Sequence, residues 1–267
     1  THKIALVGRP NVGKSSLINA IINEDRVIVD DTAGTTRDAI EVFFKQADHT
    51  YTFIDTAGLR KKAKVKESIE FYSTVRSKKS ILESDLGILV LDANDFLNKQ
   101  DKKILGQLVD AKKSFIIFVN KWDETERSDE KRKELIKMAH YELPLLEYIP
   151  FVFGSAKEKL NIGRLFNTIP SIIKERETRI PTGELNRFIK EIFLKNPPPA
   201  KKGKRIKIYY GTQAESAPPT FIFFINQPKL LDADYIRFIE RRLREHIYRF
   251  EGTPIQIFFK NHQEEKK

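Results

Sequence analysis

The stretch that most restricts the fold is 8–16, a glycine-bounded loop directly behind the apolar run 4–7. It fits the pattern G-x-x-x-x-G-K-[ST] and consists of Gly8, Arg9, Pro10, Asn11, Val12, Gly13, Lys14, Ser15 and Ser16. Between a strand and a helix, such a loop turns backbone N–H groups inward to cradle phosphate oxygens. The stretch therefore predicts a nucleotide-binding site; an ordinary glycine turn before a helix is the alternative.

The lysine, the serine and the glycines of this loop have separate roles. Lys14 is placed to bring a positive charge to the β- and γ-phosphates, and the Ser15 hydroxyl to ligate Mg²⁺. Because a Cβ at Gly8 or Gly13 would crowd the phosphates, both positions favour glycine.

Charge is unevenly spread along the 267 residues, whose formal net charge is +11. Residues 181–267 carry 17 Lys and Arg against 10 Asp and Glu, a net charge of +7, and residues 1–180 carry 31 against 27, a net charge of +4. A basic C-terminal part indicates an anionic macromolecular partner, with RNA as the first choice. A well-solvated basic surface without such a partner is the alternative.

The composition excludes several classes of protein. The chain has no cysteine, which excludes disulfides and thiolate metal sites and is typical of a reducing compartment. No apolar run approaches a membrane span and no secretory signal precedes the first strand, so we expect a cytoplasmic protein with no membrane partner. Since residue 1 is Thr and a strand follows almost at once, we expect a fragment whose upstream part is missing.

Two segments downstream of the loop are candidates for completing a magnesium site. The first lies in the polar segment 23–38 and contains Gly34, Thr35, Thr36, Arg37 and Asp38. The second follows a predicted strand at 51–54 and consists of Asp55, Thr56, Ala57 and Gly58. A carboxylate at a strand end can hold Mg²⁺ through water, and a glycine N–H beside it can reach a γ-phosphate. Either segment alone is also ordinary loop chemistry.

A basic run, 59–66, follows the second segment directly. Two interpretations have equal weight. The run is either a solvated loop, or a segment that moves with the nucleotide state and contacts RNA.

The residues after the buried strand 115–119 indicate which base is bound. Asn120, Lys121, Trp122 and Asp123 stand there. A carboxylate accepts two parallel hydrogen bonds from N1–H and the exocyclic amine of guanine, a donor pair that adenine lacks, so Asp123 selects guanine and argues against a kinase. Asn120 is expected to brace the phosphate loop, and the Lys121 stem to lie along the base. Backbone N–H groups of a second loop are expected to reach guanine O6, and this loop contains Ser155, Ala156 and Lys157.

Strands alternate with helices over 1–180, which predicts one α/β domain with a doubly wound, mostly parallel sheet and ligand loops at the carboxyl ends of strands. Strands are expected at 4–7, 40–44, 51–54, 86–91, 115–119 and 150–153, with a turn at 48–49. Helices are expected at 16–22, 99–110, 128–142 and 162–176.

Residues 181–267 predict a second, α+β domain in the order α-β-β-α-β. Helices are expected at 184–194 and 232–250, and strands at 206–210, 220–225 and 255–259, with a polar loop ending in Pro218 and Pro219 between the first two strands. The second helix is amphipathic: its isoleucine and leucine positions face inward, and its outward residues are Arg237, Arg241, Arg244 and Arg249.

Taken together, the five motifs resemble those of Era-like GTPases of the translation-factor class, and nearly the whole chain resembles the Der/EngA family of ribosome-assembly GTPases. The motifs are GRPNVGKSS at 8–16, GTTRD at 34–38, DTAG at 55–58, NKWD at 120–123 and SAK at 155–157. The resemblance implies a P-loop GTPase domain followed by a KH-like domain, a GTP/GDP site with Mg²⁺ held by Ser15 and Thr36 (Thr35 is the runner-up), and a K⁺ ion at Asn11. It also implies a role in maturation of the large (50S) ribosomal subunit, with rRNA and ribosomal proteins as partners.

The sequence departs from the family pattern in its number of GTPase domains and in its KH-like domain, and it differs from Ras-type GTPases at a third point. Family members usually carry two GTPase domains and this chain carries one, so an upstream GTPase domain is expected to be absent from it. A KH domain that clamps RNA has a GXXG loop, and none occurs between 181 and 267. Leu59 stands where Ras-type GTPases have a water-positioning glutamine.

The difference from Ras-type GTPases at Leu59 leaves two functions open. One is a GTP-hydrolysing assembly factor, for which Lys14, Thr36, Asp55, Gly58 and Asn11 are the catalytic candidates. The other is a nucleotide-gated RNA-binding or ribosome-binding module with negligible turnover on its own.

Overall fold

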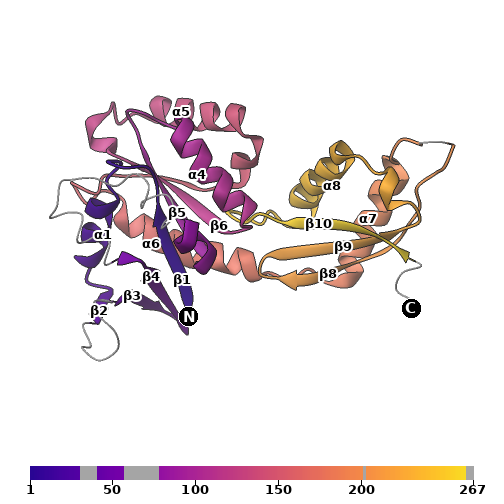
Figure 1. Cartoon of the computed structure of the whole chain (residues 1–267), viewed down its shortest axis with the longest axis horizontal. Helices are drawn as coiled ribbons and strands as arrows, with labels where there is room; N and C mark the ends of the chain where they lie inside the picture. Colours follow the sequence, from indigo (N-terminus) through magenta and orange to yellow (C-terminus); the bar gives the residue numbers. More distant parts are fainter. Residues whose placement is uncertain (31–40, 57–77, 201–202, 263–267) are drawn as a thin grey trace. The chain divides into compact units, whose positions relative to one another are not determined.

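Two compact units make up the chain, Thr1–Ile173 and Lys174–Lys267. Their structure is a computed structural model that describes residues 1–30, 41–56, 78–200 and 203–262 (Figure 1). The boundary after residue 180 expected from the sequence lies a little further along the chain than the division between these units, and it stays a prediction.

A seven-stranded sheet with the order β2-β3-β4-β1-β5-β6-β7 forms the centre of the first unit. Its strands are β1 His2–Val7, β2 Val27–Asp30, β3 Glu41–Gln46, β4 His49–Ile54, β5 Leu86–Asp92, β6 Ser114–Asn120 and β7 Phe151–Phe153. The strands from β4 to β7 in this order pair in parallel, and β3 pairs antiparallel with β2 and β4. The predicted doubly wound, mostly parallel sheet is confirmed.

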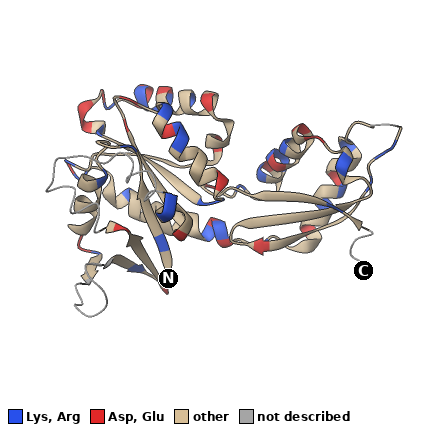
Figure 2. Ribbon diagram, viewed as in Figure 1, with Lys and Arg blue, Asp and Glu red and all other residues tan. Residues whose placement is uncertain are grey.

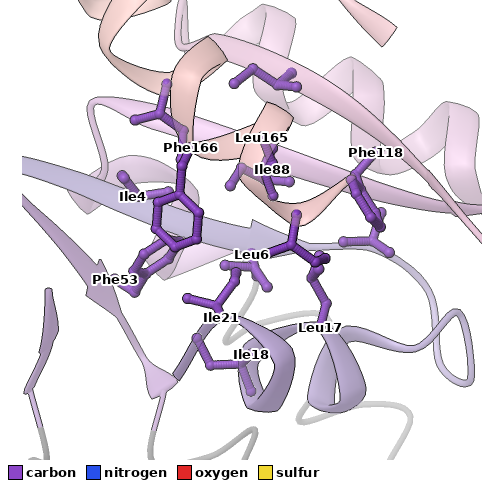
Figure 3. Packing of buried hydrophobic residues seen from close by; sticks show 14 of the residues in the cluster. Ile4, Leu6, Leu17, Ile18, Ile21, Phe53, Ile88, Phe118, Leu165 and Phe166 are labelled. Carbon is purple, nitrogen blue, oxygen red and sulfur yellow. The ribbon is translucent and has the colours of Figure 1, made fainter. Parts of the chain in front are cut away.

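Helices cover both faces of this sheet. They are α1 Lys14–Ile22, α4 Lys99–Asp110, α5 Asp129–Glu142 and α6 Ile162–Glu177, with short 3₁₀ helices at Trp122–Glu124 and Pro144–Tyr148. Side chains of α1 and α6 pack with Ile4, Leu6 and Ile88 on one face (Figure 3), and side chains of α4 and α5 share the other core with Leu89 and Leu91. Because β5 contributes to both cores, every residue of it is buried, which explains why its sequence has no polar side chain before Asp92.

Two local predictions in the first unit were wrong. Residues 27–30, expected within a polar segment, form the edge strand β2, where Val27 pairs with Phe44 and the strand extends the antiparallel ladder. The turn expected at 48–49 lies one residue earlier, because His49 pairs with Gln46 in the hairpin and Ala47 takes the positive φ of 50° that such a tight turn requires.

A three-stranded sheet with the order β10-β9-β8 and two helices form the second unit. Its elements are α7 Thr182–Lys195, β8 Ile208–Ser216, β9 Pro219–Ile225, the 3₁₀ helix Pro228–Leu230, α8 Ala233–His246 and β10 Gln256–Asn261. β9 pairs antiparallel with β8 and parallel with β10. The predicted order α-β-β-α-β is confirmed.

The polar loop expected before Pro218 and Pro219 is instead the second half of β8. Gln213 explains the error, since its side chain is buried although its residue type suggests a loop. Its Oε1 accepts from the Ile180 N–H at 2.7 Å and its Nε2 donates to Thr178 O at 2.9 Å. Burying a polar side chain costs little when its hydrogen bonds are satisfied, so the strand continues through it.

Arg244 was predicted on the outward side of the second helix, and this was wrong. It is 4% exposed, and its guanidinium donates to Arg249 O at 2.9 Å and to Phe250 O and Thr253 O at 3.1 Å. Glu240, one turn earlier on α8, lies 3.1 Å from the same group. The helix ends at His246 rather than at 250, and the chain after it returns to present these carbonyls to the buried charge.

We therefore predict that Arg244→Met destabilises the second unit by about 3 kcal/mol, because removing one partner of a buried charge network leaves the others unpaired. Arg241→Met is the matched control, since Arg241 is 58% exposed and pairs with Glu245, and it should cost less than about 1 kcal/mol. Hydrogen exchange of the β9 and α8 amides in the whole chain measures both. Equal protection in the two variants would contradict the prediction.

Candidate nucleotide-binding site

The loop between β1 and α1 lies at the carboxyl end of the parallel strands. Gly13, with φ 96°, ends the loop, and its carbonyl accepts the first helical hydrogen bond, from Leu17 N, at 2.8 Å. A Cβ at Gly8 would lie 2.6 Å from Val90 O, and a Cβ at Gly13 would lie 2.2 Å from Asn120 Nδ2. Both glycines are therefore required by the protein's own packing, in addition to the room for phosphate that the sequence suggested.

The Lys14 ammonium lies across the mouth of this loop. Its Nζ donates to Gly8 O at 2.7 Å and to Arg9 O at 2.6 Å. Ser15 beside it is half-buried and Ser16 is exposed. A cation held by two loop carbonyls beside a half-buried hydroxyl fits a site for a phosphate and its magnesium ion.

Asn120 joins three loops through its buried side chain. Its Nδ2 donates to Val12 O in the phosphate loop at 2.8 Å, and its Oδ1 accepts from the Ala156 N–H at 2.9 Å. The residue is 3% exposed and ends β6, next to the loop that follows β7. The expected bracing of the phosphate loop by Asn120 therefore has a direct counterpart in the structure.

The next three residues of this segment lie in different surroundings. Lys121 has a positive φ of 60°, and its Nζ lies 2.5 Å from Asp92 Oδ2 at the end of β5. Trp122 is buried, with its ring 4.8 Å from that of Phe153. Asp123 is half-exposed, and among the described residues nothing pairs with its carboxylate. Such a carboxylate is open to a ligand with two parallel N–H donors.

The loop after β7 is tied back onto itself. Ser155 is fully buried, its N–H donates to Leu160 O at 3.2 Å, and its hydroxyl accepts from Glu158 N at 3.0 Å. Since the Ala156 N–H donates to Asn120, a guanine O6 would share that donor or use the Lys157 N–H. The sequence predicted that backbone N–H groups of this loop reach guanine O6; in the structure, those of Ser155 and Ala156 already have acceptors within the protein.

Asp55 stands at the end of β4, beside the phosphate loop that follows β1. It has a positive φ of 62°, and its Oδ2 accepts from the Ser80 hydroxyl at 3.2 Å. Thr56 is buried. The remaining members of the predicted magnesium site and switch region lie outside the described residues: Thr35, Thr36, Ala57, Gly58, Leu59 and the basic run 59–66.

Arg9 takes part in an ion-pair network that the sequence did not indicate. Its Nη2 lies 2.8 Å from Asp95 Oδ2, and its Nε lies 3.5 Å from Asp101 Oδ1. Asp101 is fully buried and also caps α4 through the Asn98 N–H. Burial raises the pKa of the Asp101 carboxyl, and the nearby Arg9 guanidinium opposes that rise. The network anchors the phosphate loop to the start of α4.

Sequence reasoning missed three partners of the expected site residues. Asp92, which pairs with Lys121, follows a buried strand at its carboxyl end, and that position is a signal that could have found it. Asp101 and Ser80 gave no such signal, because they lie within helical segments and meet Arg9 and Asp55 only in the folded chain.

The oxygen donors at this edge fit a magnesium ion that is shared with a nucleotide. Within the described part of the chain no group of three or more Asp, Glu or His residues could hold a metal ion. Mg²⁺ in nucleotide sites needs no such cage, since it keeps several waters and takes one or two protein ligands plus phosphate oxygens. Ser15 can supply one such ligand, and Asp55 can hold the ion through a bound water. Asn11, an exposed residue with φ 65°, offers an amide oxygen to a larger cation.

Comparison with known proteins gives the family. Residues 3–121 match the family described as 50S ribosome-binding GTPase, and residues 179–260 match the KH-domain-like family of EngA bacterial GTPase enzymes, C-terminal. GTPase Der of Alkaliphilus metalliredigens is 46% identical over 97% of this chain, and GTPase Der of Desulforudis audaxviator is 44% identical over 98%. The chain belongs to the Der family of GTPases. It spans 58% and 59% of the length of these two relatives.

A solved structure of a related GTPase is also similar to this chain. The crystal structure of an Aquifex aeolicus Era variant bound to GDP.AlF4- has a TM-score of 0.49 and 22% identity, over 97% of this chain and 92% of that one. A search of the described helices finds none with the length and hydropathy that a membrane crossing needs.

We predict that Asn120→Ala destabilises the first unit by about 3 kcal/mol, because it leaves Val12 O and the Ala156 N–H buried without partners. Nucleotide affinity should also fall more than about tenfold, a loss of roughly 1.4 kcal/mol, as three loops lose their common contact. Urea unfolding followed by the single, buried Trp122 measures the stability. Asn94→Ala removes an exposed amide 3.3 Å from Glu124 and is the control; equal stability of the two variants would count against the prediction.

Proposed function

We propose that this Der-family chain binds GTP and hydrolyses it to GDP and phosphate. The observation that carries the proposal is the Asn120 side chain, which joins the phosphate loop to the loop containing Ala156 while Asp123 stays open. A phosphate-binding loop and a guanine-selecting carboxylate held together in this way support a guanine nucleotide as the ligand. The residues proposed to bind GTP are those predicted from the sequence motifs, and Ser15 and Thr36 are proposed to hold Mg²⁺.

The proposed role is in assembly of the large ribosomal subunit. The family description of residues 3–121 as a ribosome-binding GTPase and the net charge of +7 over 181–267 support it. We propose that the chain acts in the cytoplasm and contacts rRNA and ribosomal proteins through the basic second unit. The alternative, a nucleotide-gated binding module with negligible turnover of its own, is favoured by Leu59, which has no group that could orient water.

Hydrolysis requires compensation of the charge that develops between the β- and γ-phosphates. Lys14 supplies one positive charge there, and a Mg²⁺ ion would supply two more. We propose that a K⁺ ion beside the Asn11 amide oxygen provides the remaining positive charge, since Leu59 cannot assist.

This proposal predicts GTP turnover that is faster in KCl than in NaCl by about tenfold, which a barrier lowered by roughly 1.4 kcal/mol would produce. Asn11→Ala should abolish the difference between the salts. Asn19→Ala removes an exposed amide on α1, outside the loop, and should keep it. Steady-state phosphate release with GTP, and with ATP as the control nucleotide, measures these rates. A full K⁺ effect in Asn11→Ala would refute the cation site, and negligible turnover in both salts would favour the binding module.

Base selection by Asp123 gives an independent prediction. An amide at this position can donate to O2 of xanthine and accept from its N1–H, whereas it cannot accept two hydrogen bonds from guanine. Asp123→Asn should therefore lower GTP affinity at least about a hundredfold and raise affinity for xanthosine triphosphate. Glu124→Gln changes the same charge one residue along and should leave both affinities unchanged. Unaltered GTP binding by Asp123→Asn, measured by calorimetry, would contradict the base assignment.

A further inference from the structure

Aromatic rings gather at the end of the second unit's sheet where β8 begins and β9 and β10 end. The register places Tyr210 opposite Phe224 and Phe224 opposite Lys260, so these side chains share one face. The Tyr210 and Phe224 rings stack with centroids 4.5 Å apart. The His262 ring lies 4.5 Å from that of Tyr209 and 5.9 Å from that of Tyr210. Four rings from different parts of the chain therefore form one continuous cluster.

The face that carries this cluster is opposite the core of the unit. Phe221 and Phe223 of β9 belong to the buried core. Phe258 of β10 pairs with Ile222, which alternates with them, so Phe258 lies on the other face together with Tyr210 and Lys260. Phe258 is 47% exposed and Tyr209 is 41% exposed. Two large aromatic side chains are thus accessible beside a stacked cluster, where a flat ring could be added.

Basic side chains stand on the described segments that form this end of the sheet. They are Lys204, Arg205, Lys207, Lys229 and Lys260. The described segments 203–210, 224–229 and 256–262 contain no Asp or Glu, and within the described residues none of the five is in an ion pair. Asn226 holds the incoming segment to the sheet, because its Oδ1 accepts from Lys207 N at 2.8 Å and its Nδ2 donates to Arg205 O at 3.0 Å.

The arginines of α8 differ from this group. Arg237, Arg241, Arg242 and Arg244 all pair with Asp or Glu residues of the same helix. Figure 2 shows red and blue residues mixed along α8, whereas β8, β9 and β10 are almost wholly tan. The acidic residue of the strands, Glu215, lies near the opposite end of β8. The five basic residues beside the exposed rings therefore differ from the arginines of α8, because among the described residues none of the five is in an ion pair.

We propose that this end of the sheet, defined by Tyr209, Tyr210, Phe258, Lys260 and His262, binds a single-stranded RNA segment. Exposed aromatic rings stack on unpaired bases of any sequence, and surrounding lysines and arginines neutralise the phosphates. A duplex keeps its bases within its own stack and gives the rings nothing to contact. The choice of RNA over DNA rests on the proposed ribosomal role. The inference that bases stack on this surface does not depend on that role. Such a surface needs no GXXG loop, which this chain lacks.

The test is fluorescence anisotropy of the whole chain with a labelled ten-nucleotide single-stranded RNA, the same sequence as DNA, and a blunt RNA duplex. We expect the single-stranded RNA to bind more tightly than the duplex. Phe258→Ala and Tyr209→Ala should each weaken single-strand binding about tenfold, and Phe258→Tyr should retain it, since it keeps the ring. Lys260→Gln should reduce the slope of log affinity against log salt by about 0.7, the value for one phosphate contact on a single strand.

Two variants outside this surface serve as controls. Tyr141→Ala removes an aromatic side chain on α5 that is 88% exposed, and Arg241→Gln removes a paired charge on α8; both should leave RNA affinity unchanged. Hydrogen exchange of β9 checks that Phe258→Ala stays folded.

Three results would overturn the inference: equal affinity for duplex and single strand, unchanged RNA affinity in Phe258→Ala, or tighter binding of DNA than of RNA. If Phe258→Ala instead kept its RNA affinity and lost binding to purified ribosomal proteins, the surface would be a protein contact. GTP turnover, measured in the same variants, should be unchanged. If the unaltered chain did not hydrolyse GTP, the proposed hydrolysis would be contradicted, and the RNA-binding result would still stand.

Discussion

A single buried amide, that of Asn120, connects the parts of the first unit that would contact a nucleotide. Its two hydrogen bonds reach loops that follow two other strands, to Val12 O and from the Ala156 N–H. Because a buried polar group without a partner is costly, this amide specifies the relative positions of the three loops as well as stabilising them. Gly13 belongs to the same constraint, since any Cβ there would collide with the amide nitrogen.

The sheet of the first unit was predictable where strands are buried on both faces. Segments 86–91 and 115–119 have no polar side chain because helices cover each side of them, so their sequences alone indicate central parallel strands. The edge strand β2 was not predictable in this way. It is four residues long and has one neighbour, β3. Although Val27, Ile28 and Val29 are β-branched, polar residues flank them on both sides, so pairing with the β3–β4 hairpin decides the structure of this short run. Gln213 in β8 is the same case, since partners more than thirty residues away satisfy it.

The positions of the expected site residues followed from motif spacing, because the carboxyl ends of parallel strands meet at one edge. Their partners did not follow. Arg9 contacts Asp101 across more than ninety residues, and Lys121 contacts Asp92 through the register of β5 and β6. A sequence motif shows which residue types contact the ligand. The residues that contact those side chains and fix their orientation come from other helices and strands, so they depend on how these elements pack.

The second unit shows why net charge alone does not locate a binding surface. The +7 of residues 181–267 counts every arginine equally. Arg244 is nevertheless buried in the core and hydrogen-bonded there. The exposed arginines of α8 each pair with an acidic residue three or four positions away on the same helix, which offsets part of their charge. Within the described residues, the lysines next to the start of β8 and at the end of β10 have no ion-pair partner, so no ion pair there offsets their positive charge. An anionic partner responds to that local imbalance, and the adjoining aromatic rings determine whether the partner must also offer exposed bases.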